Sequence, residues 1–430
     1  MAIEHFKRYF GYTFWVAMEV VAFVGLPRLV IFPVAAHFLG KEQFGLFIFS
    51  LSIAMLLGTA PAAGLATGVI RHMAELEASA RDTLVSTSIR LCKIAMLLIV
   101  LIGIVALGIA RYFWQIDPKV IWCLVPLLIL LYPGNVLDLQ MVQYRVGRKF
   151  ALRTVWYSVL GMLLFITIPA AIFGGVVGMA WGYMLGYVIT HVLLSWKQKI
   201  LFKRSNYDAK LASLLKKIWL HISIANILSL SGRYIYRLIL GVFYSYSTVA
   251  IFFGATNIID LCMAPMSILS VLLLSMLSGF SRLEDVGKRQ RYTVLAAAVS
   301  IGVGGPLIVL LVGPFILSVI FPDFADESTQ ILRWLVMVVP CLTAENFSRP
   351  FVIKFGPIKF VPVLNFITLM GHLVPAITLI PKLGMKGAAI SYNIGYGLSA
   401  ISWLGALFWT LKFGHKYKSD VEVLYPMDGE

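Results

Sequence analysis

Long apolar runs separated by short polar segments fill the whole chain. Twelve of these runs have about 18 residues or more, enough for a helix to cross a hydrocarbon core ~30 Å thick. They lie near residues 10–39, 44–70, 91–114, 120–143, 152–173, 175–196, 218–244, 247–280, 292–320, 330–353, 360–380 and 384–411. The polar segments reach only about 20 residues, which leaves no room for a separate soluble catalytic domain. The pattern predicts an all-α polytopic membrane protein, with the first run retained as a span rather than cleaved as a signal peptide.

The two halves of the chain share residues at a nearly constant offset. The pattern G-x-x-x-x-Y-x-x-G-Y begins at Gly178 and again at Gly387, an offset of 209 residues. Further pairs follow at offsets of 204 to 209: Arg28 with Arg233, Pro61 with Pro265, and Arg145 with Lys354. Because each half holds an even number of spans, both halves enter the membrane from the same side. The repeat predicts two six-helix bundles related by a pseudo-two-fold axis along the membrane normal.

Composition and charge support a membrane protein and orient it. Hydrophobic residues make up 60% of the chain and charged residues 13%, well away from the balance of soluble domains. The net charge of +16 suits nucleic acid at first sight, but 27 of the 36 Lys and Arg fall in alternate loops on one side, against five on the other. This bias predicts cytoplasmic termini and no nucleic-acid partner. We expect bundles at 1–200 and 218–414, a basic cytoplasmic linker at 201–217 and a cytoplasmic tail at 415–430.

Polar residues line one face of the seventh predicted span. They are spaced three or four residues apart, so they share a side of a helix: Ser223, Asn226, Ser229, Arg233 and Arg237. An arginine at the centre of a bilayer costs about 2.5 to 3.5 kcal/mol on insertion scales, so this face must meet protein or water. One interpretation is a cationic substrate cavity formed by Arg28, Arg233, Arg237 and Asn226. The alternatives are snorkelling of Arg237 to the membrane surface and structural pairing of the arginines with buried acids.

Buried acids are candidates for ion coupling. Glu19 and Asp260 lie well inside apolar sequence, where a carboxyl can carry a proton. Glu19 is equally well explained as a neutral, hydrogen-bonded core acid. Glu345 precedes Arg349 by one helical turn, which predicts a local ion pair between them.

Prolines and histidines complete the set of candidate functional residues. Pro61 and Pro265 recur between the halves and remove backbone hydrogen bonds within spans, which makes them hinge candidates. The histidines are scattered without the spacing of metal ligands, so we expect neither a metal site nor a cofactor. No G-x-x-x-x-G-K-[ST] loop occurs in the sequence, which excludes a pump with a P-loop ATPase.

The segment FPVAAHFLGKEQFGLFIFSLSI, residues 32 to 53, resembles the start of bacterial polysaccharide flippases of the Wzx type. These flippases belong to the multidrug/oligosaccharidyl-lipid/polysaccharide exporter superfamily. The residues that carry the resemblance are Leu39-Gly40, Phe44-Gly45-Leu46, Gly64-Leu65 and Arg71. The resemblance implies a transporter, not an enzyme, in the bacterial inner membrane that flips an undecaprenyl-diphosphate-linked oligosaccharide, such as an O-antigen unit, by alternating access. Its expected partners are this lipid-linked substrate, membrane lipids, a polysaccharide polymerase and a chain-length regulator.

Two other functions stay open. A cation-coupled exporter of drugs or metabolites from the same superfamily would share this architecture. A membrane glycosyltransferase or polysaccharide polymerase fits less well, because such enzymes generally need a sizeable outer loop with catalytic acids. The longest outer loop here lies near residues 321–330, and we expect its acids, Asp323, Asp326 and Glu327, to form a solvated turn.

Overall fold

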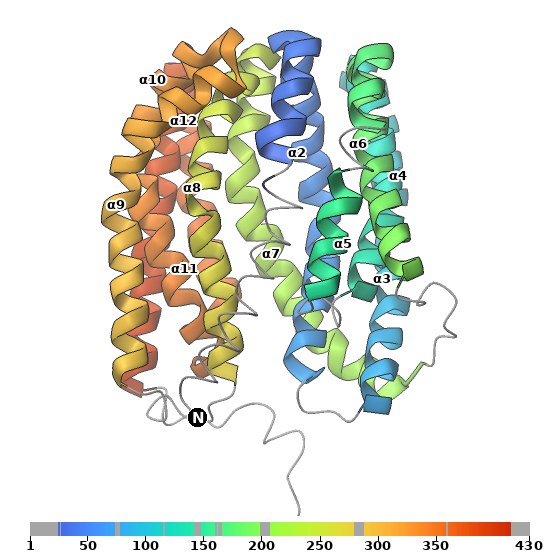
Figure 1. Ribbon diagram of the computed structural model, residues 1–430, viewed down its shortest axis with the longest axis vertical. Helices are drawn as coiled ribbons and strands as arrows, with labels where there is room; N and C mark the ends of the chain where they lie inside the picture. The colour runs from blue at the N-terminus through green and yellow to red at the C-terminus, as the bar shows by residue number, and fades with distance from the viewer. Residues whose placement is uncertain are drawn as a thin grey trace, which may run out of the picture.

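The computed structural model describes most of the chain, and its secondary structure is helical throughout the described part (Figure 1). The described residues are 25, 27–73, 78–114, 117–141, 148–159, 161, 166–197, 207–278, 288–357 and 360–413. The elements are η2 (Pro27–Ile31), α2 (Phe32–Met73), α3 (Ala78–Trp114), α4 (Pro118–Met141), α5 (Arg148–Ser158), α6 (Ile168–Lys197), α7 (Ala209–Phe243), α8 (Tyr246–Ser278), α9 (Lys288–Ile320), η6 (Pro322–Phe324), α10 (Ala325–Leu335), α11 (Val338–Phe355) and α12 (Phe360–Phe413). In these ranges, seven helices are long and apolar enough to cross a membrane, and the bent pair α10–α11 adds an eighth.

Three of the long helices each contain two spans that meet at a glycine. Gly40 in α2, Gly175 in α6 and Gly384 in α12 have positive φ angles of 71°, 57° and 59°, which end one helix and start the next. Residues on the two sides of the α6 and α12 turns, at similar distances from the glycine, pack together. A side chain at Gly178, for example, would collide with the backbone of Ala170 on the other side of the α6 turn. Such contacts identify the turns as helical hairpins rather than gentle kinks.

The α12 hairpin shows the same arrangement in its hydrogen bonds. Thr368 donates to the hydroxyl of Ser399 at 3.1 Å, and Gly371 lies against Leu398. Divided at the three glycines, the described ranges contain a segment of each of the twelve predicted spans. η2 with the start of α2 is the end of the first span, and α10 with α11 is the tenth. The predicted all-α, two-bundle fold class is therefore confirmed.

The helix ends differ from the predicted ones where helices extend beyond the apolar runs. α7 starts at Ala209, inside the segment expected to be a linker, because the Asp208 side chain caps its first turn by accepting from the N–H groups of Lys210 and Leu211. The tenth span is bent by 57° between α10 and α11. The expected solvated turn near residue 321 is a 3₁₀ turn, η6, that leads directly into α10.

Residues related by the repeat meet each other in space. Glu42 accepts a hydrogen bond from the backbone N–H of Ser247, 205 positions later, at 3.0 Å. A side chain at Gly45 would meet the backbone N of Ala250, again 205 positions later. Only residues beside a two-fold axis can contact their own equivalents. The pseudo-two-fold axis therefore passes between these pairs, where α2 packs against α8.

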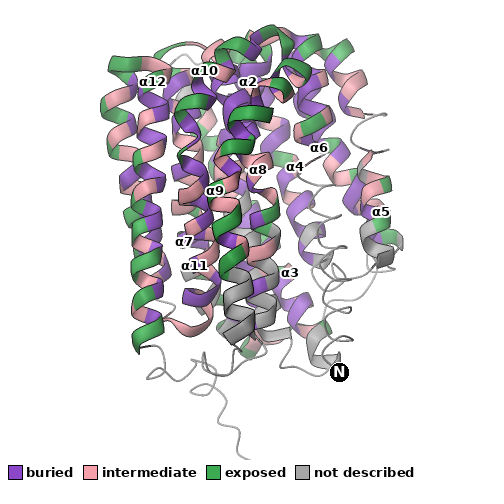
Figure 2. Ribbon diagram, turned by 60° about the vertical axis from the view of Figure 1, so that its left-hand side comes forward, coloured by how far each residue is buried: buried purple, intermediate pink, exposed green. Residues whose placement is uncertain are grey.

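α7 crosses between the two halves of the molecule (Figure 1). Its N-terminal end lies against α3, since the N–H of Asp208 donates to the Thr87 hydroxyl at 3.2 Å, and Arg90 of α3 lies 4.6 Å from the Tyr207 ring. Its C-terminal part packs against α12 and α8 of the C-terminal half and against α2 of the N-terminal half. Figure 2 shows buried residues on the inner faces of the helices and exposed ones outside. The most exposed large side chains are apolar, for example Phe173 and Leu311, as expected of helices that face lipid.

The hairpin turn of α12 gives a test of this arrangement. Gly384 has φ 59° and ψ −133°, a region essentially restricted to glycine, so Gly384→Ala should cost on the order of 1 to 3 kcal/mol. Gly397 lies in the same element with open space around it, so Gly397→Ala should be neutral or stabilise the helix by up to about 1 kcal/mol. Thermal melting of the two variants in detergent checks this. Equal melting temperatures would contradict the assigned turn.

Candidate functional site

An aromatic plug closes the space between the halves near the end of the molecule that carries Lys41, called here the Lys41 end. The plug consists of Phe32 and Phe44 from the N-terminal half and Phe253, Phe321 and Phe324 from the C-terminal half. The Phe253 ring lies 5.6 Å from the Phe32 ring and 5.7 Å from the Phe44 ring, and Phe44 is also 5.9 Å from Phe321. All five side chains are buried. The closely packed rings leave no path for a polar solute here.

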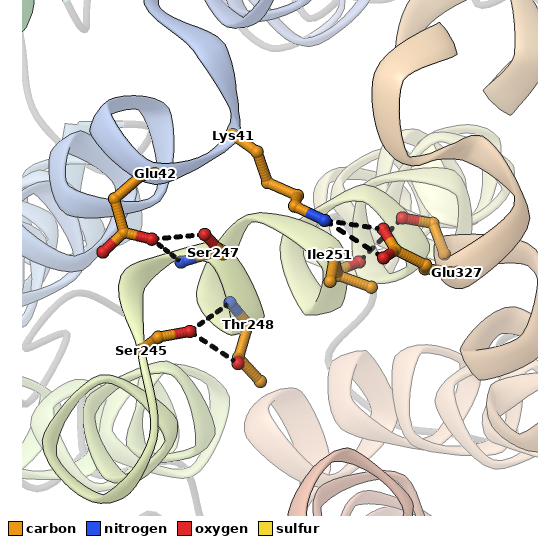
Figure 3. A network of polar contacts seen from close by, with 8 residues as sticks. Lys41, Glu42, Ser245, Ser247, Thr248, Ile251 and Glu327 are labelled. Carbon is orange, nitrogen blue, oxygen red and sulfur yellow. Dashed lines mark hydrogen bonds and ion pairs between the residues drawn. The ribbon is translucent and has the colours of Figure 1, made fainter.

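A polar latch lies above the plug, at the surface of the Lys41 end (Figure 3). Lys41 Nζ donates to both carboxylate oxygens of Glu327 in α10, at 3.0 and 3.1 Å. Glu42 accepts from the N–H and hydroxyl of Ser247 at the start of α8. Both contacts join the two halves. The sequence pattern shows Glu327 only as a polar residue in a short loop, because its partner is 286 positions away.

Below the plug, an ion pair joins the halves. Arg28 Nη1 lies 2.5 Å from Asp260 Oδ2, and the two side chains are 21% and 12% exposed. Asn257, one turn before Asp260 on α8, donates to the backbone carbonyl of Arg28 at 3.2 Å. Asp260 is 13 residues along α8 from the latch serine Ser247, or roughly 20 Å at helical rise. The pair therefore lies deep within the membrane-spanning part of the molecule.

Arg28 belongs to a π-helical turn, η2, instead of a regular α-helix. π-helical turns are rare and occur frequently at functional sites, because the extra residue redirects the side chains around it. Here the turn aims Arg28 at the C-terminal half. The prediction that the arginines pair with buried acids thus holds for Arg28, and the acid is one of the two ion-coupling candidates.

Arg237 lies between the ion pair and the plug. Its Nη2 donates to the Thr256 hydroxyl at 3.2 Å, and its guanidinium lies 5.0 Å from the Phe253 ring and 5.5 Å from the Tyr234 ring. The residue is only 7% exposed, so it does not snorkel to the membrane surface. Its Nε is buried without a hydrogen-bond partner among the described residues. Because this atom is buried, the unused donor faces the protein interior in this state.

Arg233 is the least constrained of the three arginines. Its side chain is partly buried and makes no hydrogen bond or ion pair with the residues that the structure describes. Asp260 and Tyr396 lie within electrostatic range of its guanidinium. The carboxylate of Asp260 in turn interacts electrostatically with Arg28, Arg233 and Arg237. Among the described residues, three arginines thus act on the carboxylate of Asp260, so their positive charges outnumber its negative charge.

A cluster of ring side chains surrounds Arg233 on the side of α12. The Tyr236 hydroxyl lies 2.6 Å from His372 Nδ1 and donates to the Ser391 carbonyl at 3.0 Å. The Tyr392 ring lies 4.9 Å from the Tyr236 ring and 4.8 Å from the Tyr396 ring. Tyr392 and Tyr396 stand in the repeated glycine–tyrosine pattern, so the sequence contained the signal, although it predicted only a repeat. All of these rings are buried, so in this state they pack the C-terminal half rather than face an open space.

The remaining candidates lie apart from this centre. Asn226 is partly buried on α7, about two turns from Arg233, without a hydrogen bond to a described residue. Pro265 lies inside α8 with an exposed side chain. Pro61 falls within α2, but its side chain is outside the described part of the structure. Glu19 also lies outside the described residues. Hinge and ion-coupling roles for these residues stay predictions.

The predicted pair between Glu345 and Arg349 is wrong. The Glu345 carboxylate accepts from the Ser399 hydroxyl of α12 at 2.8 Å. Arg349 instead lies over the Trp403 ring, 5.6 Å from its centroid. The neighbouring helix therefore offers each side chain a better partner than the other one on α11. In the described ranges, no group of His, Cys, Asp and Glu side chains is arranged to hold a metal ion.

Comparisons with known proteins identify the fold. No protein-family model matches the chain, and no curated protein sequence matches it. Among solved structures, a multidrug resistance MATE family transporter of the MOP superfamily matches in its outward-facing conformation with TM-score 0.70 and 17% identity, over 96% of both chains. The inward-facing conformation of such a transporter matches with TM-score 0.68 and 15% identity, over 94% of this chain and 98% of the other.

A third match is a MOP superfamily transporter from Pyrococcus furiosus, for which the reverse polarity of the binding pocket suggests a different function. Its TM-score is 0.71 at 16% identity, over 95% of this chain and 96% of the other. The chain thus has the fold of MATE transporters of the MOP superfamily. The likeness in fold does not single out the polysaccharide flippases, and that resemblance stays a prediction.

Because the same fold occurs in inward- and outward-facing conformations, the latch should influence which end is closed. Lys41 and Glu327 are partly exposed, and such pairs contribute about 0.2 to 1 kcal/mol. Lys41→Glu should therefore lower the equilibrium constant for closing the Lys41 end by about 1.4- to 5-fold. Spin labels at the exposed positions Gln43 and Asp326, with the four native cysteines replaced by alanine, measure the distance between the halves. The charge swap Lys41→Glu with Glu327→Lys should restore the closed population. Identical distance distributions in the single and double variants would contradict a role for the latch.

Proposed function

We propose that this protein is an alternating-access transporter of an anionic substrate. The observation that carries the proposal is the interior centre where Arg28 is paired with Asp260 and where Arg233 and Arg237 also act on this carboxylate. Guanidinium groups keep their charge at physiological pH and bind phosphate in bidentate geometry, so such a centre favours an anion and repels a cation. The closed plug on one side of this centre fits one of the two states that alternating access requires.

The finer proposal is that the anion is the diphosphate of a lipid-linked oligosaccharide, flipped for polysaccharide synthesis. The three guanidiniums could supply donors for the several acceptor oxygens of a diphosphate. The rings of Tyr236, Tyr392 and Tyr396 are packed against one another in this state, so stacking with a sugar would require another state of the transporter to expose them. The resemblance of residues 32–53 to polysaccharide flippases supports the same substrate. A polymerase and a chain-length regulator would then be its partners.

The alternative is a multidrug or metabolite exporter, and the likeness to MATE multidrug transporters favours it. The residues that carry the flippase resemblance do not decide between the two. Phe44 belongs to the plug and Gly45 lies at the contact with α8, so both residues serve the joint between the halves rather than the binding centre. For the Pyrococcus furiosus relative, reverse polarity of the pocket suggests a different function. Charge in the pocket is therefore the better guide to the substrate, and it favours an anion.

The likeness to transporters also favours transport over a glycosyltransferase or polymerase reaction. The acids once considered for such chemistry do not converge on the centre: Glu327 is bound to Lys41, and Asp323 lies in the η6 turn. With the termini in the cytoplasm of a bacterial cell, as the distribution of Lys and Arg predicts, the Lys41 end faces outward. The structure would then be the inward-facing state.

Removing the central arginines tests the anionic substrate. Arg28→Ala and Arg233→Ala should each lower transport by about tenfold or more, because each removes a charge-assisted hydrogen bond to the substrate. The control is Arg333→Ala, which removes an exposed arginine of α10 and should leave transport unchanged. Complementation of a polysaccharide-flippase deletion measures transport in cells. Unchanged complementation by both central variants would contradict the proposal.

Ethidium efflux separates the two substrate classes. A flippase should complement the deletion and leave ethidium efflux at the level of cells without the protein. A multidrug exporter of cations should give the opposite result, and the anionic centre would then have another role. The experiment uses the full chain, with expression verified in the membrane fraction.

A further inference from the structure

The ion pair between Arg28 and Asp260 has no counterpart in the other half of the repeat. Arg28 and Arg233 are equivalent at an offset of 205 residues. At the same offset, the position equivalent to Asp260 is Met55 on α2. The two-fold axis would thus place a methionine where Arg233 needs an acid. One member of the arginine pair is neutralised by the protein, and the other makes no ion pair with a described residue.

We propose that Asp260 is a resident counter-ion for Arg28, which the anionic group of the substrate displaces during transport. The inference rests on the proposed function and names the event by which substrate binding is linked to movement of the halves. In the empty protein, the carboxylate occupies the place on Arg28 that a phosphate oxygen would take. When an anion binds, Arg28 changes partner.

The geometry supports an exchange of partners rather than simultaneous binding. Asp260 lies at 2.5 Å from Arg28 Nη1 and within electrostatic range of the other two arginines. A second anion among the same three guanidiniums would be repelled by the carboxylate at short range. Arg233, which is only partly buried and makes no hydrogen bond or ion pair with a described residue, provides donors from which an incoming anion can begin to bind. Asp260 would then have to leave Arg28 for binding to be completed.

The exchange would control the joint between the halves. Arg28 belongs to the N-terminal half, and Asp260 to α8 of the C-terminal half. Asn257 holds the backbone carbonyl of Arg28 beside the ion pair, so both interactions fasten η2 to α8. Only replacement of the carboxylate by a bound anion would loosen this attachment without leaving a buried arginine unpaired, which is costly. An empty transporter therefore stays closed at the Lys41 end.

Inorganic pyrophosphate is the probe for this exchange, with the spin-label pair at positions 43 and 326 as the reporter. Asp260→Asn removes the competing carboxylate while it keeps the shape of the side chain. It should loosen the closed state without any anion and lower the pyrophosphate concentration for half-maximal change by about tenfold or more. Glu345→Gln is the matched control, because this buried carboxylate of the same half contacts Ser399 and no arginine. It should behave as the unmodified protein does.

The double variant Arg28→Gln with Asp260→Asn controls for misfolding of the single variant. It removes both charges, so no buried charge is left unpaired. It should show the loosened distance distribution and a much weaker pyrophosphate response. If pyrophosphate acts on the unmodified protein and on Asp260→Asn at the same concentration, the proposal that Asp260 is a displaced counter-ion is wrong. The proposal of an anionic substrate is not affected by that result. If pyrophosphate changes the distances in neither protein, both proposals fail.

Discussion

The cost of placing a guanidinium in hydrocarbon determines how the two halves of this protein meet. On a lipid-facing surface, Arg28, Arg233 and Arg237 would each cost about 2.5 to 3.5 kcal/mol or more. Helices gain no hydrophobic driving force by leaving lipid, so close packing and polar contacts must hold the bundles together. The interface between the two halves both shelters the arginines from lipid and provides polar contacts between the bundles. The arginines lie between the halves, and the contacts that shelter them, the Asp260 ion pair and the Phe253 ring, come largely from α8.

The backbone follows the internal repeat, and the chemistry departs from it. The turns at Gly175 and Gly384 are 209 residues apart and have nearly the same dihedral angles. A symmetric backbone alone would give each half the same affinity for charge. Asp260 has no equivalent acid in the other half, where Met55 takes its position. Arg28 therefore has an ion-pair partner, whereas Arg233 has none among the described residues. Duplication thus explains the fold, and this asymmetry distinguishes the two halves chemically.

The features that could be predicted from the sequence are those that depend on local composition. The twelve spans follow from hydropathy, and the repeat follows from spaced glycines and tyrosines. The sequence could not show which distant residues become neighbours. Glu327 was expected in a solvated turn, yet it binds Lys41 at 286 positions' distance. Glu345 was matched with the nearest cation in sequence, but Ser399 on α12 is its partner. The spacing of residues in the sequence shows which side chains are neighbours on the same helix. In a bundle, each side chain also has neighbours on other helices, which the spacing does not show.

The same reasoning explains why family resemblance and substrate are separate questions here. The residues similar to those of polysaccharide flippases surround the turn at Gly40, where the first two spans meet α8. Phe44 and Gly45 are constrained by close packing at the moving joint, so proteins of this fold with different substrates have reason to retain them. On the proposed function, the substrate is selected instead by the charges deeper in the membrane, where Arg28, Arg233 and Arg237 act together on the carboxylate of Asp260. A change of charge at these positions would alter the preferred substrate, while the surrounding helices kept their arrangement.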